Sequence, residues 1–63
     1  MKGRFKGENL SMGFIKGKTY ELRSKVRNNL IFLFDKNSPK YCPYSSMETV
    51  LQNWDFGGIV WEN

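Results

Sequence analysis

The chain has 63 residues, which predicts one folded domain over residues 1–63 and leaves no room for a second. Hydrophobic residues make up 40% and aromatic residues 16%, enough for one compact core, and a single cysteine excludes an intrachain disulfide. The net charge of +4 is uneven, because residues 1–27 hold eight of the ten lysines and arginines. This excess of positive charge in the first half indicates an acidic partner or, more simply, exposed strand faces whose charges keep the protein soluble.

Cysteine content and hydropathy also bear on location. Secreted domains of this size usually depend on several disulfides, so their absence, together with an N-terminus unlike a signal peptide, predicts a reducing cytoplasm. The longest apolar run covers residues 30–34, far short of the roughly 20 residues that cross a bilayer. We therefore expect no membrane partner.

The first predicted strand covers residues 2–7. Basic side chains at positions 2, 4 and 6 alternate with Gly3, Phe5 and Gly7, which predicts a charged outer face and an inner face with a bulge or a close approach at its glycines. Residues 8–17 form a loop with four apolar side chains. We expect this loop to fold back over the core.

Three more strands follow in chain order. Residues 18–26 alternate strictly, with Tyr20 and Leu22 on the face opposite the charges, and Asn28-Asn29 predicts a tight turn. Residues 30–34 form a continuous apolar strand, and residues 35–39 are strong turn formers. Residues 40–44 form a short strand that lies at an edge or ends at Pro43, which has no ladder hydrogen bond to donate.

A helix of two to three turns is predicted next. Ser45 and Glu48 have capping-box spacing, and one apolar stripe follows at Met47, Val50, Leu51 and Trp54. Two glycines at 57–58 end the helix, and residues 59–62 form a last strand. The order β-β-β-β-α-β predicts a mainly β domain. It is either a small five-stranded SH3-like barrel or a strongly twisted open sheet covered on one face by the helix.

Two segments carry a resemblance to a known group of proteins. Residues 13–22 (GFIKGKTYEL), together with residues 41–48 (YCPYSSME) and Asn53-Trp54, are similar to small uncharacterised proteins encoded by phages and prophages of Gram-positive bacteria. The resemblance implies an SH3-like fold and an accessory phage product that acts on a host protein in the cytoplasm of a bacterial host cell. It assigns no functional residue.

Catalytic groups are sparse. The chain has no histidine, and one cysteine without histidine makes neither a nucleophile pair nor a zinc site. The acidic residues are scattered, and Glu48 is better explained by the helix cap. We expect a non-enzyme without metal or cofactor. Cys42 is expected to be a small buried apolar residue, and a reactive thiol stays the alternative.

Two surfaces are candidate binding sites. If the first two strands pair, their basic side chains form one stripe suited to nucleic acid, with candidate residues Arg4, Lys6, Arg23, Lys25 and Arg27. The nearest rings, Phe5 and Tyr20, point inward, so this stripe lacks aromatic partners.

The second candidate surface is the apolar strand at residues 30–34. Either it is covered on both faces, or one face is a contact surface for a partner or a second copy. The candidate residues are Phe32, Phe34, Tyr41 and Tyr44, while both tryptophans are assigned to the core. Our first expectation is a protein-binding module, a phage-encoded modulator or inhibitor of a host protein. The alternatives are a nucleic-acid-binding accessory protein and a self-associating structural domain, including a homodimer.

Overall fold

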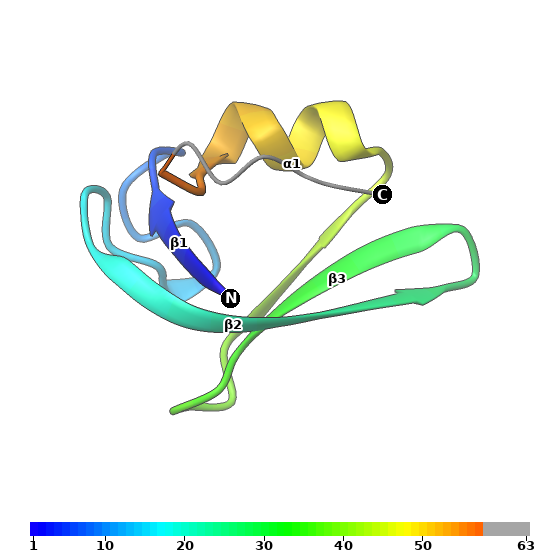
Figure 1. Cartoon of the computed structure of the whole chain (residues 1–63), viewed down its shortest axis with the longest axis horizontal. Helices are drawn as coiled ribbons and strands as arrows, with labels where there is room; N and C mark the ends of the chain where they lie inside the picture. The colour runs from blue at the N-terminus through cyan, green and yellow to red at the C-terminus, as the bar shows by residue number, and fades with distance from the viewer. Residues whose placement is uncertain (58–63) are drawn as a thin grey trace.

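The computed structural model describes residues 1–57 and contains five strands in one antiparallel sheet, with a short helix packed against it (Figure 1). Within these residues the strand order is β4-β3-β2-β1-β5, and the sheet does not close into a barrel. The elements are β1 (Lys2–Phe5), a 3-10 turn (Ser11–Gly13), β2 (Thr19–Arg27), β3 (Leu30–Asp35), β4 (Tyr41–Tyr44), α1 (Met47–Asn53) and β5 (Trp54–Asp55). The mainly β domain with one short helix before its last described strand is confirmed. Of the two predicted architectures, the open sheet is the one present.

Strand β2 joins the two parts of the sheet. Its first residues pair with β1, and the stretch from Leu22 to Arg27 pairs with β3 (Figure 1). Asn28 and Asn29 connect β2 to β3 with φ angles of 52° and 64°. Two positive φ angles are what a two-residue type I′ hairpin turn requires, and asparagine tolerates them better than most residues. The predicted turn is therefore confirmed.

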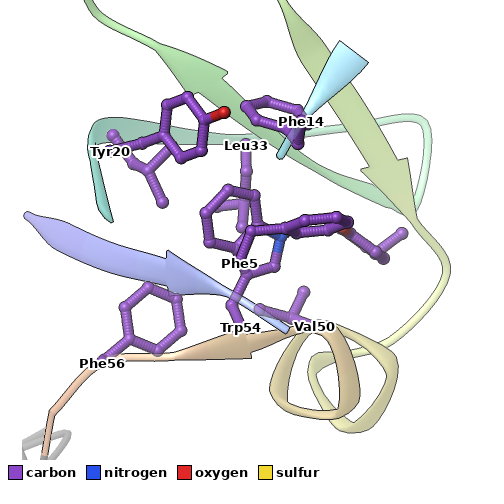
Figure 2. Close-up of a cluster of buried hydrophobic side chains, with 9 residues drawn as sticks. Phe5, Phe14, Tyr20, Leu33, Val50, Trp54 and Phe56 are labelled. Carbon is purple, nitrogen blue, oxygen red and sulfur yellow. The ribbon is translucent and has the colours of Figure 1, made fainter. Parts of the chain in front are cut away.

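The core lies on the inner face of the sheet, centred on Trp54 (Figure 2). The Trp54 ring centroid lies 5.0 Å from those of Phe5 and Phe14 and 5.9 Å from that of Tyr20. Tilted and edge-on aromatic pairs at such distances add to the free energy gained by burial. Phe14 comes from the loop between β1 and β2 and is fully buried, so this loop folds back over the core as predicted. It does so through Phe14 alone, since its other apolar side chains, Leu10, Met12 and Ile15, are exposed.

Close packing explains the glycine at position 3. A Cβ atom there would lie 2.9 Å from side-chain atoms of Leu22 and Phe56. Other atoms therefore pack closely against the inner face of β1, as predicted. These atoms belong to side chains and not to another backbone.

The start and the apolar stripe of α1 differ from the prediction. The N-cap is Ser46, whose Oγ accepts a hydrogen bond from the Thr49 amide at 3.2 Å, and not Ser45. Val50 is buried, whereas Met47 and Leu51 are each 42% exposed. The helix thus buries a narrower stripe than its sequence indicates, because seven residues make only about two turns against the sheet.

The end of α1 also differs from the prediction. The helix stops at Asn53, and Trp54 is extended, with φ −137° and ψ 138°. Trp54 pairs with Phe5 on β1 and belongs to β5. Its ring reaches the core from a strand and not from the last turn of the helix. The strand predicted at residues 59–62 and the core assignment of Trp61 lie outside the described residues.

Candidate ligand-binding face

The sheet surface opposite the core carries the candidate site, and we call it the outer face. Register places Arg23 beside Phe34 and Lys25 beside Phe32 across β2 and β3. Directly paired residues of antiparallel strands point to the same side of a sheet. The basic side chains of β2 therefore share a surface with the phenylalanine rings of β3. We use the name for the part of this surface that runs from Arg23 to the hairpin turn and across β3 to β4. It comprises Arg23, Lys25, Arg27, Leu30, Phe32, Phe34, Tyr41 and Pro43, and Glu21 precedes Arg23 on the same side of β2.

Three rings form a continuous cluster on the outer face, and we call it the ring triad: Phe32, Phe34 and Tyr41. The two phenylalanine rings are stacked, with centroids 6.1 Å apart and planes inclined by 24°. The Tyr41 centroid lies 6.1 Å from that of Phe32 and 5.8 Å from that of Phe34, and Tyr41 is 45% exposed. In residues 1–57 no helix or strand covers this cluster, since Phe14 and the helical Val50 pack into the core on the inner face.

The basic row consists of Arg23, Lys25 and Arg27, all exposed. Alternate residues of a strand lie about 6.7 Å apart, so the three charges form a regular line beside the ring triad. The Arg23 guanidinium carbon lies 5.8 Å from the Phe34 ring centroid, within cation–π range. The ion pairs found within residues 1–57 join the N-terminal amine to Glu21 and Lys40 to Asp35, so neither neutralises this row.

A hollow lies where the two sets of side chains meet. It measures about 230 Å³ and is lined by Lys25 and Arg27 from β2, Phe32 and Phe34 from β3, and Tyr41 from β4. A second hollow, of about 330 Å³, shares Lys25 and Phe34 and extends along β2 past Arg23. Sites that enclose a small ligand usually measure about 300–1,000 Å³ and surround it. Open hollows along a strand suit segments of an extended ligand instead.

Tyr44 is not part of this surface. It lies on the inner face, is only 6% exposed, and its hydroxyl accepts a hydrogen bond from the Trp54 indole nitrogen at 2.7 Å. Burial raises the pKa of Tyr44 well above its usual range. We therefore leave Tyr44 out of the binding site and assign it to the core.

The predicted basic stripe is interrupted at β1. Strands β1 and β2 pair as expected, but Arg4 lies between Thr19 and the acidic Asp55, and Lys2 lies opposite Glu21. A hollow of about 290 Å³ at this end includes Asp55 among its lining residues. Negative charge beside the cations makes this end a poorer site for an anion than the basic row.

Lys6 also lies apart from the basic row. It follows the last residue of β1, and its amide donates a hydrogen bond to the Asn53 carbonyl at 2.8 Å. Its side chain is exposed at the opposite end of the sheet from the hairpin that carries Arg27. Of the five predicted basic residues, three therefore form a compact row beside the rings.

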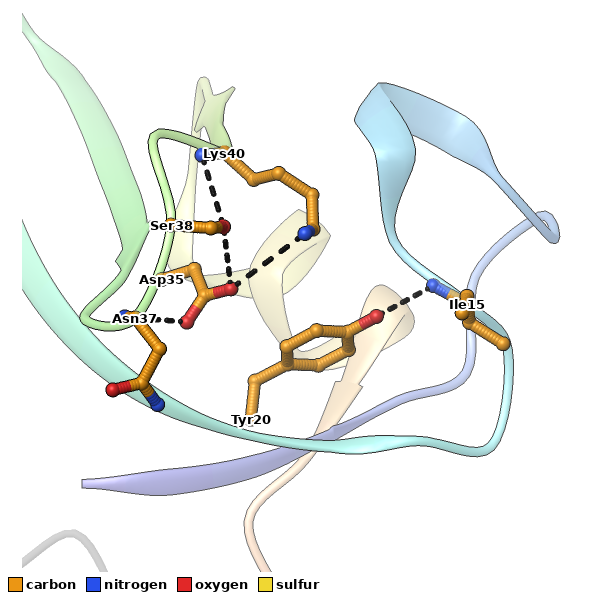
Figure 3. Close-up of polar contacts among 6 residues, drawn as sticks. All are labelled: Ile15, Tyr20, Asp35, Asn37, Ser38 and Lys40. Carbon is orange, nitrogen blue, oxygen red and sulfur yellow. Dashed lines mark hydrogen bonds and ion pairs between the residues drawn. The ribbon is translucent and has the colours of Figure 1, made fainter.

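The most buried acid is structural. The Asp35 carboxylate accepts hydrogen bonds from the Asn37 amide at 2.9 Å and the Ser38 hydroxyl at 2.7 Å, and Lys40 Nζ lies 3.8 Å away (Figure 3). The Asn37 hydrogen bond, followed by that from Ser38, lowers the pKa of Asp35. This arrangement closes the predicted turn between β3 and β4.

Neither a metal centre nor a membrane span is found in the part of the chain that the structure describes. Residues 1–57 contain no group of three or more potential histidine, cysteine or carboxylate ligands, and no helix long and apolar enough to cross a bilayer. Cys42 is partly buried on the inner face of β4, with Sγ 3.8 Å from the Pro43 carbonyl oxygen.

No family model, curated protein or solved structure matches the chain. The resemblance to phage-encoded proteins stays a prediction, and the assignment of function depends on the geometry of the outer face.

Proposed function

We propose that this domain is a non-catalytic, nucleic-acid-binding accessory protein and that the outer face is its binding surface. The observation that carries the proposal is a row of three exposed cations, none of them in an ion pair within residues 1–57, directly beside three rings. Of these rings, Tyr41 is exposed and Phe32 and Phe34 are partly exposed. Cations attract phosphates, and exposed rings stack on bases.

A protein partner was the first expectation from sequence because of the small size, the aromatic content, the sparse catalytic groups and the phage resemblance. Nucleic acid ranked second because Phe5 and Tyr20, the rings nearest the charges, point inward. Cross-strand register removes that objection, since Phe32 and Phe34 lie opposite Lys25 and Arg23. An exposed tyrosine would also suit a protein interface, but a row of three cations would then need an acidic partner. Nucleic acid satisfies both features of the face at once.

We also propose that the fold is SH3-like. The strand order, the long loop after β1 and the short helix before β5 support this. Action on a host protein, as the phage resemblance implies, stays a prediction.

The test is binding of a fluorescently labelled 12-nucleotide DNA by anisotropy across a salt series. With three phosphate contacts, the logarithm of the binding constant should fall with the logarithm of salt concentration with a slope of about −2, at roughly 0.7 per contact. Replacing Arg23, Lys25 and Arg27 by serine should weaken binding at low salt at least tenfold and remove most of the slope. The thermal unfolding of this variant should match the parent, because all three side chains are exposed.

The matched control replaces Lys6, Lys16 and Lys18 by serine. These lysines are also exposed and lie between β1 and β2 in the chain, away from the basic row. Their loss lowers the net charge by the same three units, from +4 to +1. The control should retain binding within about threefold of the parent. Equal losses in both variants would mean that net charge alone drives binding, and no binding by the parent would refute the proposal. A concentration-dependent dimer that loses self-association on replacement of Tyr41 would point to the self-associating alternative.

A further inference from the structure

The outer face arranges its charges and rings in two parallel tracks. We infer that the ligand is single-stranded nucleic acid, with its sugar–phosphate backbone along β2 and its bases turned toward β4. The inference rests on the proposed function and specifies the form and orientation of its ligand.

Register defines the two tracks. Arg23, Phe34 and Tyr41 lie side by side across three strands, and Lys25 and Phe32 form the next row. Neighbouring strands are about 4.8 Å apart, so each ring lies one or two strand spacings from a cation. A nucleotide likewise carries its phosphate and its base at opposite ends. One chain of nucleotides can therefore place phosphates on the basic row while its bases reach the ring triad.

The ring triad favours a single strand over a duplex. In a duplex the flat faces of the bases are covered by stacked neighbours, and only base edges are accessible in the grooves. Rings on a sheet surface gain stacking energy only from bases whose faces are free. With a duplex the rings would add nothing, and only the basic row would contribute.

Recognition should tolerate different sequences. The outer face has one neutral hydrogen-bonding side chain, the Tyr41 hydroxyl, to read base edges, whereas stacking is open to every base. Three rings with centroids within 6.1 Å of each other offer contact to two or three bases.

The experiment compares three labelled 12-mers bound by the full chain: single-stranded DNA, its duplex, and an abasic strand that keeps the phosphates but has no bases. The single strand should bind at least tenfold tighter than the duplex or the abasic strand. Phe34→Leu and Tyr41→Leu, which keep an apolar side chain but remove the ring, should each weaken single-strand binding about tenfold. Neither should change the salt slope or binding to the abasic strand.

Two control variants separate stacking from charge and from general surface effects. Lys25→Ser should reduce the salt slope by about 0.7 for the single strand and the abasic strand alike. Ile15→Ala removes an exposed apolar side chain far from the outer face and should leave all binding unchanged. Thermal unfolding of each variant establishes that it is folded. If Phe34→Leu is unstable, Tyr41→Leu at the exposed sheet edge provides the ring test by itself.

The outcomes distinguish this inference from the function on which it rests. Equal binding of duplex and single strand, or unchanged binding by both ring variants, would overturn the single-strand inference and leave nucleic-acid binding in place. Failure to bind any of the three probes would overturn both. Displacement of the DNA by poly-glutamate as effectively as by unlabelled DNA of equal charge would replace both with an acidic protein partner.

Discussion

At the scale of single residues, two tyrosines on β4 point to opposite sides of the sheet and should respond differently to loss of their hydroxyl groups. Tyr44→Phe leaves the buried Trp54 indole N–H without its acceptor, which should cost about 1–3 kcal/mol of unfolding free energy. Tyr41→Phe should change stability by less than about 0.5 kcal/mol because Tyr41 is exposed. Urea denaturation of both variants measures the difference, and equal stabilities would contradict the assignment of Tyr44 to the core.

Asp35 should make folding stability depend on acidity. Its pKa is lower in the folded protein than in the unfolded chain, so its ionised form stabilises the fold above the unfolded pKa of about 4. That contribution is lost as the pH falls below 4 toward the folded pKa. Asp35→Asn should therefore be less stable than the parent at pH 6, and the gap should narrow by pH 3. Because both proteins share every other acid, a gap that stays constant with pH would contradict the turn geometry around Asp35.

At the scale of elements, the β2–β3 hairpin shows how much of the site the sequence contains. A two-residue turn at Asn28-Asn29 implies that residues 27 and 30 are paired, and hence 25 with 32 and 23 with 34. The neighbourhood of cations and rings was therefore available from sequence. This neighbourhood was not predicted, because the charges were compared only with Phe5 and Tyr20, the rings of β1 and β2. They were not compared with the rings of β3.

The end of the helix could not be obtained in this way. An apolar residue seven positions after Met47 fits the helical stripe, and Trp54 reaches the same core from a strand. Pairing with Phe5, far away in the chain, decides between the two conformations, and local propensity contains no information about that contact. Similarly, Ser45 and Ser46 are equally good cap residues by type. The choice depends on which hydroxyl reaches the Thr49 amide.

At the scale of the whole molecule, none of the helices and strands within residues 1–57 covers the outer face. The loop after β1 and α1 both pack on the inner face, where they complete one aromatic core (Figures 1 and 2). An antiparallel sheet can expose its other face to water, which usually carries polar residues. Here that face carries three cations and three rings. This departure from the usual pattern is why we interpret the face as a binding surface.

The most direct test of the outer face as the binding surface is residue-by-residue mapping of a nucleic-acid complex by NMR. Single-stranded 12-mer DNA would be titrated into ¹⁵N-labelled protein at low salt. We predict that the largest amide shifts occur in β2 from Arg23 to Arg27, in β3 and around Tyr41, while α1 and the loop after β1 change little. Shifts concentrated on α1 or on that loop, with β3 unaffected, would contradict the account.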